Sequence, residues 1–218
     1  MKHSGTDITS LQKIPTGYFL ITAFLIAVVT PFDGLVVSNM PAESSYERGD
    51  FQSLLRILGY LPTWLLVSLI LSQTMPKDPH RKCASPAVAI SLTALVSGLI
   101  AEALKPVFRR PDPQLGSEGS WQRSPLGEQW WDGTDFCFPS GHSAVAFGAA
   151  LAICRRWPRT TPWILIAAGG CAASRIIERG HHPSDVLAKV SYRLLTTDTT
   201  THYADRIMQT VLTKYVVN

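Results

Sequence analysis

The apolar stretch at residues 87–104 reads AVAISLTALVSGLIAEAL, and Glu102 is its one charged residue. A helix of about 20 such residues crosses the hydrocarbon core of a bilayer. This stretch therefore predicts a membrane-spanning helix. Further apolar blocks that are long enough, or nearly so, occupy residues 18–37, 54–72, 141–154 and 163–177. We expect an all-α, integral membrane bundle of five to six transmembrane helices.

The block at residues 18–37 follows a polar N-terminus without the small-residue cleavage site of a signal peptide, so we expect it to be retained as an anchor. Pro31 and Asp33 interrupt this block. Proline removes a helical hydrogen bond, and a carboxylate is costly in lipid. We therefore expect the first span to end near these two residues.

Positive residues predict how the bundle is oriented, because cytoplasmic loops carry an excess of Lys and Arg. Here they precede the first block, separate the second from the third, and separate the fourth from the fifth. They are Lys2, Lys13, Lys77, Arg81, Lys82, Arg155, Arg156 and Arg159. A cytoplasmic N-terminus follows, with the end of the third helix, the start of the fourth and the end of the fifth at the outer face. The net charge of +4 fits this topology, and no basic stripe with interleaved aromatic residues predicts a nucleic-acid partner.

Three polar segments meet at the predicted outer face, and together they supply cations and the start of a helix. This combination can bind a phosphoryl group through charge and hydrogen bonds alone. The candidate phosphate-binding residues are Lys105, Arg110, Ser140, Gly141 and Arg175, with Arg109 as a substitute for Arg110. No carboxylate cluster accompanies them, and the four cysteines lack metal-binding spacing, so we expect no metal and no cofactor.

Two histidines and an aspartate complete this site. Asp185 lies four residues after His181, so the two can share a helical face, and the carboxylate can orient the imidazole. His181 is the candidate nucleophile and would form a phosphohistidine. His142 is the candidate acid for the departing oxygen and then the base for the attacking water.

These residues resemble the signatures of the type 2 phosphatidic acid phosphatase (PAP2) family, the membrane relatives of vanadium haloperoxidases and bacterial acid phosphatases. One signature reads Pro-Ser-Gly-His at residues 139–142, and another is complete as Ser174-Arg175, His181 and Asp185. The resemblance covers roughly residues 17–188. It implies a six-helix membrane fold, metal-independent hydrolysis of a phosphomonoester or diphosphate, and the same roles for His142, His181 and Asp185.

The remaining family signature is altered. The family has a lysine separated by six residues from Arg-Pro. In this chain the six residues 106–111 separate Lys105 from Asp112, and the Arg-Pro begins at Arg110. We expect Arg110 to reach the phosphate through a changed loop path. Asp112 would repel the phosphate, so we expect its side chain to turn away.

The chain is divided by composition into a membrane phosphatase domain at residues 1–188 and a polar tail at residues 189–218. The charges of the tail do not suit a lipid-facing span, so we expect an amphipathic helix or an atypical sixth helix. Within the domain, residues 105–138 form a predicted outward-facing loop whose tryptophans could cap the site and select a headgroup.

The sequence as a whole predicts a membrane phosphatase that acts on a lipid phosphate monoester or diphosphate. We expect it in a bacterial cytoplasmic (inner) membrane, with its active site facing the periplasm and lipid as its partner. Phosphatidate, phosphatidylglycerophosphate, a polyprenyl diphosphate and lipid A are candidate substrates. Two alternatives stay open: a lipid phosphotransferase that uses the same intermediate, and a non-catalytic phosphate-binding or transport protein.

Overall fold

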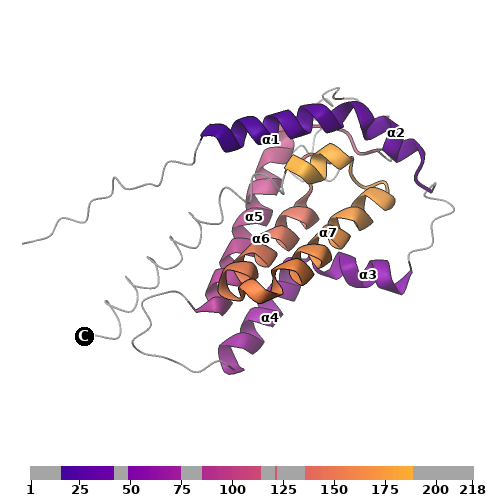
Figure 1. Ribbon diagram of the computed structural model, residues 1–218. Coiled ribbons are helices and arrows are strands. Elements are labelled where there is room, and N and C mark those ends of the chain that lie inside the picture. Colours follow the sequence, from indigo (N-terminus) through magenta and orange to yellow (C-terminus); the bar gives the residue numbers. More distant parts are fainter. Residues whose placement is uncertain (1–15, 42–48, 75–84, 114–120, 122–135, 189–218) are drawn as a thin grey trace, which may run out of the picture.

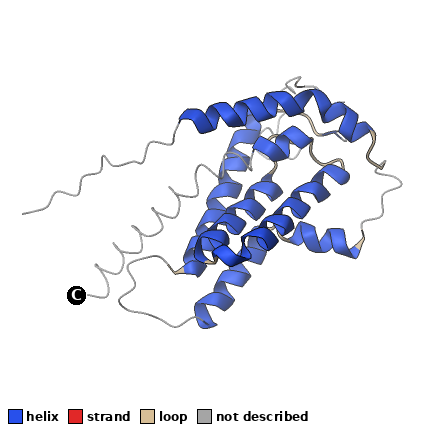
Figure 2. Cartoon of the chain, viewed as in Figure 1, coloured by secondary structure: helices blue, strands red, loops and turns tan. Residues whose placement is uncertain are grey.

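The structure is a computed structural model that describes residues 16–41, 49–74, 85–113, 121 and 136–188. All regular elements within these residues are helices, as Figure 2 shows. They are α1 (Thr16–Val29), the 3-10 helix η1 (Thr30–Phe32), α2 (Asp33–Ser38), α3 (Asp50–Ile57), α4 (Leu61–Thr74), α5 (Pro86–Phe108), α6 (Gly141–Arg156), the 3-10 helix η4 (Pro158–Thr160) and α7 (Thr161–Ile177). Residues 183–188 are also helical. The predicted all-helical architecture is confirmed for the described part of the chain.

Each apolar block of the sequence contains helix, but the helices differ in their capacity to cross a membrane. Among the described residues, Leu20–Ser38 and Pro86–Phe108 are long and apolar enough to span, with mean hydropathies of 2.2 and 2.0. Helices α3 and α4 qualify only as a pair bent by 69°. Helices α6 and α7 have 16 and 17 residues. Two or three candidate spans are thus found, and the number of five to six stays a prediction.

The first span continues beyond the point where the sequence predicted its end. A 3-10 turn forms at Thr30–Phe32, and Asp33 then begins helix α2, which continues to Ser38. The expected end near Pro31 and Asp33 is therefore wrong. Its physical premise does not apply, because Asp33 is completely buried against protein and is not exposed to lipid.

Helices α5, α6 and α7 pack side by side with α6 in the middle, while α4 packs against α5 and α3 against α7 (Figure 1). Helices α1 and α2 run across one end of this group in the same view. That end is joined to α2 by contacts from Asp33 to Arg110 and Ser184. The same end contains the loops that follow α5 and α7.

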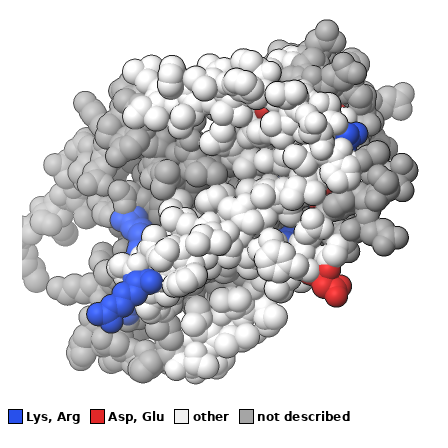
Figure 3. Space-filling view, turned by 45° about the vertical axis from the view of Figure 1, so that its right-hand side comes forward, with Lys and Arg blue, Asp and Glu red and all other residues white. Residues whose placement is uncertain are grey.

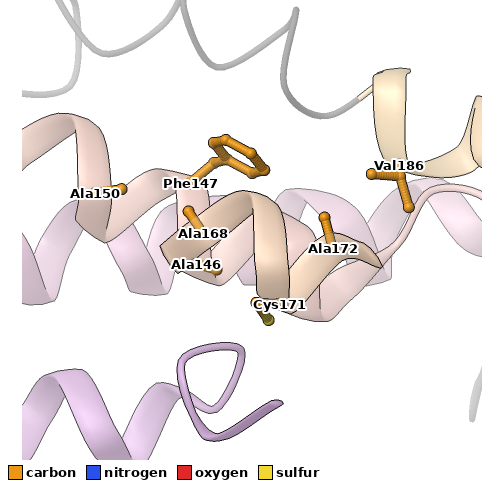
Figure 4. Packing of buried hydrophobic residues seen from close by; sticks show 7 residues of the cluster. All are labelled: Ala146, Phe147, Ala150, Ala168, Cys171, Ala172 and Val186. Carbon is orange, nitrogen blue, oxygen red and sulfur yellow. The ribbon is translucent and has the colours of Figure 1, made fainter. Parts of the chain in front are cut away.

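Small residues allow α6 to approach both of its neighbours closely, as is common in membrane helix bundles. On the α7 side, four alanines and Cys171 form a cluster with Phe147 and Val186, which Figure 4 shows: Ala146, Phe147, Ala150, Ala168, Cys171, Ala172 and Val186. On the α5 side, a Cβ atom at Gly148 would lie 2.8 Å from the carbonyl oxygen of Thr93. This close packing fixes the N-terminal end of α6 relative to the ends of α5 and α7.

The surface of the described residues is largely apolar. Little Lys, Arg, Asp or Glu surface is visible on the face shown in Figure 3. Large apolar side chains are exposed on several helices, among them Leu20, Phe24, Leu66, Leu69, Trp163 and Ile166. Exposure of many large apolar side chains on several helices is expected where helices contact lipid. The fold is therefore that of a membrane protein.

Candidate active site

A cavity of about 400 Å³ lies where the C-terminal half of α5, the start of α6 and the end of α7 converge. Apolar residues such as Leu95, Leu99 and Val145 line part of its wall. Its polar lining includes five of the residues that the sequence analysis selected: Lys105, Gly141, His142, Arg175 and His181. Three segments that are far apart in the sequence thus bring candidate cations and both candidate catalytic histidines to one space.

Ser140 begins helix α6 and lies behind the cavity. Its side chain is completely buried, and its Oγ accepts a hydrogen bond of 3.0 Å from the hydroxyl of Ser143 and a longer one from the Ser143 N–H. This is the pattern of an N-cap, which leaves the next residues, Gly141 and His142, to face the cavity. Ser140 therefore starts the helix, and the geometry does not support its predicted direct contact with phosphate.

His142 is held at the cavity by the bend between α3 and α4. The ring of Tyr60 packs edge-on against the imidazole with centroids 4.8 Å apart, and a Cβ atom at Gly59 would lie 2.7 Å from the His142 Cβ. Within the described residues, the buried His142 Nε2 has no hydrogen-bond partner. This nitrogen is available to exchange a proton with a ligand. Gly59 and Tyr60 were not identified from the sequence, since they belong to no recognised signature.

His181 is oriented by a backbone carbonyl. Its Nδ1 lies 2.8 Å from the carbonyl oxygen of Cys137, and because a carbonyl can only accept, Nδ1 carries the proton. The neutral ring then has its lone pair on Nε2. Burial lowers the pKa of His181 to about 3, although the nearby charge of Asp185 acts in the opposite direction. His181 is therefore neutral near pH 7, as a nucleophile must be.

Asp185 lies behind His181 and is completely buried. The imidazole closest to its carboxylate is that of His182, not that of His181. Oδ2 of Asp185 accepts from the backbone N–H of His182 at 2.7 Å and lies 3.3 Å from His182 Nδ1. The corresponding distance to His181 Nδ1 is 4.0 Å. The prediction that Asp185 orients His181 thus has no direct hydrogen bond behind it, and the carbonyl of Cys137 occupies that position. His182 was not selected as a site residue from the sequence.

Arg110 is buried between two carboxylates and does not line the cavity. Its guanidinium lies 2.7 Å from Asp33 and 2.5 Å from Asp185, and it packs over the ring of Trp121 at 4.3 Å. With two carboxylates against it, the guanidinium is not directed at an anion in the cavity. The geometry thus gives the predicted contact of Arg110 with phosphate no support. Arg109 ends helix α5 with a φ of 52° and also lies outside the cavity lining.

Asp33 was not selected as a site residue by sequence reasoning. The signal was present, because a carboxylate within an apolar span is costly unless it has a partner or a function. Only the fold shows that its partners are Arg110 and Ser184.

Both candidate cations of the cavity are paired with carboxylates. Lys105 Nζ lies 2.9 Å from Glu102, whose other carboxylate oxygen lies against Gly141. Arg175 forms an ion pair with Glu178, which also binds Arg56 of α3 at 3.2 Å. A substrate phosphate would meet Lys105 and Arg175 as members of these pairs. Glu102, Glu178 and Arg56 lie outside the sequence signatures, and their role became visible only in the fold.

Asp112 is one of the residues that line the cavity, and the turning of its side chain away from the phosphate stays a prediction. Its place in the lining has a local reason: Pro111 pairs with Phe136 in a single antiparallel bridge, which keeps the segment after α5 beside the site. The lining of the cavity therefore contains Asp112 at the place where the PAP2 signature has arginine.

Cys137, His182 and Asp185 bring three potential metal ligands within 4.8 Å of one another, all buried. Their atoms are already engaged: the Cys137 thiol lies 3.1 Å from the carbonyl oxygen of Pro111, and Arg110 contacts Asp185. Burial, followed by the charge of Asp185, raises the pKa of the Cys137 thiol above its usual range, which disfavours the thiolate that binds metal. This cluster is best described as a hydrogen-bonded support for Asp185.

The aromatic loop is described only in part. Trp121 packs edge-on against Phe138 with ring centroids 4.8 Å apart, so it contacts the segment that precedes α6. The rest of the predicted loop, including Trp130 and Trp131, and the predicted tail helix at residues 189–218 lie outside the described residues.

Comparison with known proteins identifies the family and a similar fold. The family model of the PAP2 superfamily matches residues 86–196, just over half of the 218-residue chain. One similar solved structure is the first transmembrane PAP2 type phosphatidylglycerolphosphate phosphatase from Bacillus subtilis. Its TM-score is 0.60 at 20% identity, over 88% of this chain and 96% of that chain. No curated protein matches significantly. The match over residues 86–196 contains α5, α6, α7 and most of the residues that line the cavity, and this chain belongs to the PAP2 superfamily.

Proposed function

We propose that this chain hydrolyses a phosphate monoester or diphosphate of a membrane lipid through a phosphohistidine at His181, without a metal ion. Membership of the PAP2 superfamily makes the chain a phosphatase, and its apolar helices make it a membrane protein. The observation that carries the finer proposal is that His142 and His181 line one cavity together with Lys105 and Arg175.

The first step would be attack of His181 Nε2 on phosphorus. The bond from phosphorus to the leaving oxygen breaks, and His142 donates a proton to that oxygen. A bound phosphate dianion favours the protonated form of His142 before this step. Lys105, Arg175 and the free N–H groups of the first turn of α6 would stabilise the charge on the transferring phosphoryl group.

The second step would be hydrolysis of the phosphohistidine. Water attacks phosphorus, His142 accepts a proton from that water, and the phosphorus–nitrogen bond breaks to return neutral His181. The hydrogen bond from His181 Nδ1 to the Cys137 carbonyl supports both steps, because it keeps Nε2 as the reacting nitrogen.

The surroundings of the cavity support a lipid as the substrate. Leu95, Leu99, Val145 and Tyr60 supply an apolar wall next to the polar groups, which would suit a headgroup phosphate with its acyl part alongside. The Lys and Arg distribution supports a site at the outer face, in a bacterial cytoplasmic membrane with the site toward the periplasm. Because the similar Bacillus subtilis protein is a phosphatidylglycerolphosphate phosphatase, phosphatidylglycerophosphate is the first lipid to test.

The test is phosphate release by the full chain in detergent with EDTA present. Phosphatidylglycerophosphate, phosphatidate, undecaprenyl diphosphate and lipid A are compared for the wild type, His181→Ala and the control Arg159→Lys. Arg159 is exposed beyond the far end of α6 from the cavity. We expect release from at least one lipid by the wild type and the control, and a loss of at least 1000-fold in His181→Ala.

The stability of a labelled phosphoenzyme in acid and in base also tests the proposed intermediate. Phosphohistidine is stable in base and is hydrolysed in acid. Labelling that persists in His181→Ala, or release that EDTA abolishes, would contradict the proposal. Transfer of the label to an added lipid alcohol in preference to water would identify a phosphotransferase with the same intermediate. Absence of both release and labelling in folded protein would favour the non-catalytic binding protein.

A further inference from the structure

We propose that Asp33 and Arg110 are positioning residues for the reaction, through which the first membrane helix holds Asp185 and the turn that carries His181. This proposal rests on the catalytic role of His181 given above. It assigns to Arg110 a function behind the cavity in place of a contact with the substrate phosphate.

The contacts of Asp33 reach directly into the turn after α7. Its Oδ1 accepts the backbone N–H of Ser184 at 3.0 Å, and its Oδ2 accepts the Ser184 hydroxyl at 2.5 Å. The same Oδ2 lies 2.7 Å from Nη2 of Arg110. One carboxylate at the start of α2 therefore satisfies both hydrogen-bond donors of Ser184 and one end of the guanidinium.

Arg110 joins this carboxylate to the one beside the nucleophile. Its Nη1 donates to Asp185 Oδ1 at 2.5 Å and to the Ser184 hydroxyl oxygen at 2.7 Å. The side chains of Asp33, Arg110 and Asp185 are all 0% exposed. The guanidinium thus lies between two fully buried carboxylates that come from segments far apart in the sequence.

The energetics favour a positioning role over a purely stabilising one. Removing three charges from water costs several kcal/mol per ion, and their mutual attraction repays this only with good geometry. Apolar residues of similar volume often stabilise a core equally well or better. What a buried charged network provides in addition is a defined geometry, since few other arrangements satisfy every donor and acceptor.

Two routes connect Arg110 to His181. On the backbone route, the Arg110 carbonyl accepts the N–H of Cys137 at 2.9 Å, and the Cys137 carbonyl in turn accepts from His181 Nδ1 at 2.8 Å. On the side-chain route, Arg110 holds Asp185, whose Oδ2 accepts the His182 N–H at 2.7 Å. Arg110 therefore constrains the nucleophile through both residues that approach its Nδ1.

The same network reaches the start of α6. The backbone carbonyl of Asp185 accepts the N–H of Ser140 at 3.4 Å, and Ser140 is the residue that caps α6 immediately before Gly141 and His142. A second tie anchors α2 to the turn, because Arg179 Nη2 donates to the carbonyl oxygen of Met40 at 2.8 Å. A shift of α2 would consequently change the position of His181 relative to His142.

The proposal predicts a specific kinetic signature. Neither Asp33 nor Arg110 lines the cavity, so their loss should leave substrate binding nearly unchanged. Misplacement of a nucleophile by about 1 Å can reduce a rate about 100-fold. We expect Asp33→Asn and Arg110→Lys each to lower kcat by about 10- to 100-fold, with KM changed less than about threefold. A phosphate contact by Arg110 would instead raise KM and weaken inhibition by inorganic phosphate.

The experiment measures kcat, KM and the inhibition constant for inorganic phosphate on the full chain in detergent. The substrate is whichever lipid of the panel above the wild type turns over fastest. The variants are Asp33→Asn, Arg110→Lys, Ser184→Ala and the matched control Asp50→Asn, which is an exposed carboxylate in the first turn of α3. His181→Ala is included to report on the proposed function itself.

Folded Asp33→Asn with wild-type kcat, or with a raised KM and a weakened phosphate inhibition, overturns the positioning role. If Asp33→Asn does not fold, Ser184→Ala decides, because it removes only the hydroxyl that bridges Asp33 and Arg110. Its expected effect is a loss of about 3- to 10-fold in kcat at constant KM, and an unchanged kcat contradicts the proposal. Activity that survives His181→Ala, or is absent in the wild type, refutes the proposed function and with it the catalytic role on which this inference rests.

Discussion

His181 Nδ1 lies 2.8 Å from the carbonyl oxygen of Cys137, whereas Oδ2 of Asp185 lies 4.0 Å from the same nitrogen. A carbonyl fixes the tautomer of a histidine without adding a full negative charge against the ring. Asp185 then acts on the imidazole as a charge at a distance and as a partner of the neighbouring backbone. This division of roles allows orientation of the nucleophile to be tested separately from stabilisation of its positive charge.

The low pKa of His181 predicts how the stability of the protein depends on pH. Burial lowers this pKa to about 3 in the folded state, against an ordinary value of 6.5. The unfolded chain therefore binds more protons between these values. Stability that is fully present above pH 6.5 is lost as the pH falls toward 3, by about 2 kcal/mol at pH 5 relative to pH 7.5.

The measurement is thermal or denaturant unfolding in detergent at pH 7.5 and pH 5, for the wild type and His181→Gln. Glutamine does not titrate in this range and can still donate to the Cys137 carbonyl. We expect the wild type to lose more stability between the two pH values than His181→Gln. An equal loss in both proteins would show that other groups account for the acid sensitivity.

The proposed role of His142 predicts a dependence on the leaving group. A general acid matters most when the departing oxygen is a poor leaving group, such as the alkoxide of a lipid alcohol. We expect His142→Ala to lower turnover of a lipid phosphate by about 100- to 10000-fold and that of para-nitrophenyl phosphate much less in the first step. Pre-steady-state release of nitrophenolate measures that step alone. Equal losses in this step for both substrates would exclude proton donation by His142.

Much of the site was predictable because it is encoded in short segments. The apolar blocks with their flanking charges place the ends of α5, α6 and α7 together, and the signatures assign His142, Arg175 and His181 to those ends. In the structure these residues line one cavity together with Lys105. The order of the motifs along the chain, and the membrane face predicted for each helix end, were sufficient for this part of the prediction.

The partners of Arg110 could not be predicted in the same way. Its carboxylates are Asp33 and Asp185, which lie 77 and 75 positions away, and neither spacing follows from a local pattern. The contact that orients His181 comes from the backbone of Cys137, and no side-chain signature records a carbonyl. The sequence analysis assigned Lys105, Arg110 and Arg175 to the substrate phosphate. In the fold, each of these three side chains forms an ion pair with a carboxylate of the chain.

Glu102 predicts an unusual gain of affinity when its charge is removed. It pairs with Lys105 at 2.9 Å and has an oxygen against Gly141, so it lies where a substrate phosphate would meet the start of α6. Its side chain is 53% exposed, which limits the strength of the interaction through solvent screening. We expect Glu102→Gln to lower KM and the inhibition constant for inorganic phosphate by about two- to fivefold, with kcat unchanged. A large loss of kcat would instead place Glu102 among the groups that act on the substrate.

Asp112 provides the sharpest test of how the altered signature affects the site. It lines the cavity at the position where the family signature has arginine, so Asp112→Arg replaces a negative charge by a positive one beside the phosphate. Two unit charges about 4 Å apart interact with roughly 1 kcal/mol in bulk water and roughly 4 kcal/mol near a protein surface, before screening by salt. We expect Asp112→Arg to tighten inhibition by inorganic phosphate by about 10-fold or more, and Asp112→Asn by a smaller factor.

Kinetic inhibition constants at two salt concentrations measure both effects, and added salt should reduce them. Weaker phosphate inhibition in both variants would mean that Asp112 supports the site by a route other than its charge, and that its presence in the cavity is required for phosphate binding.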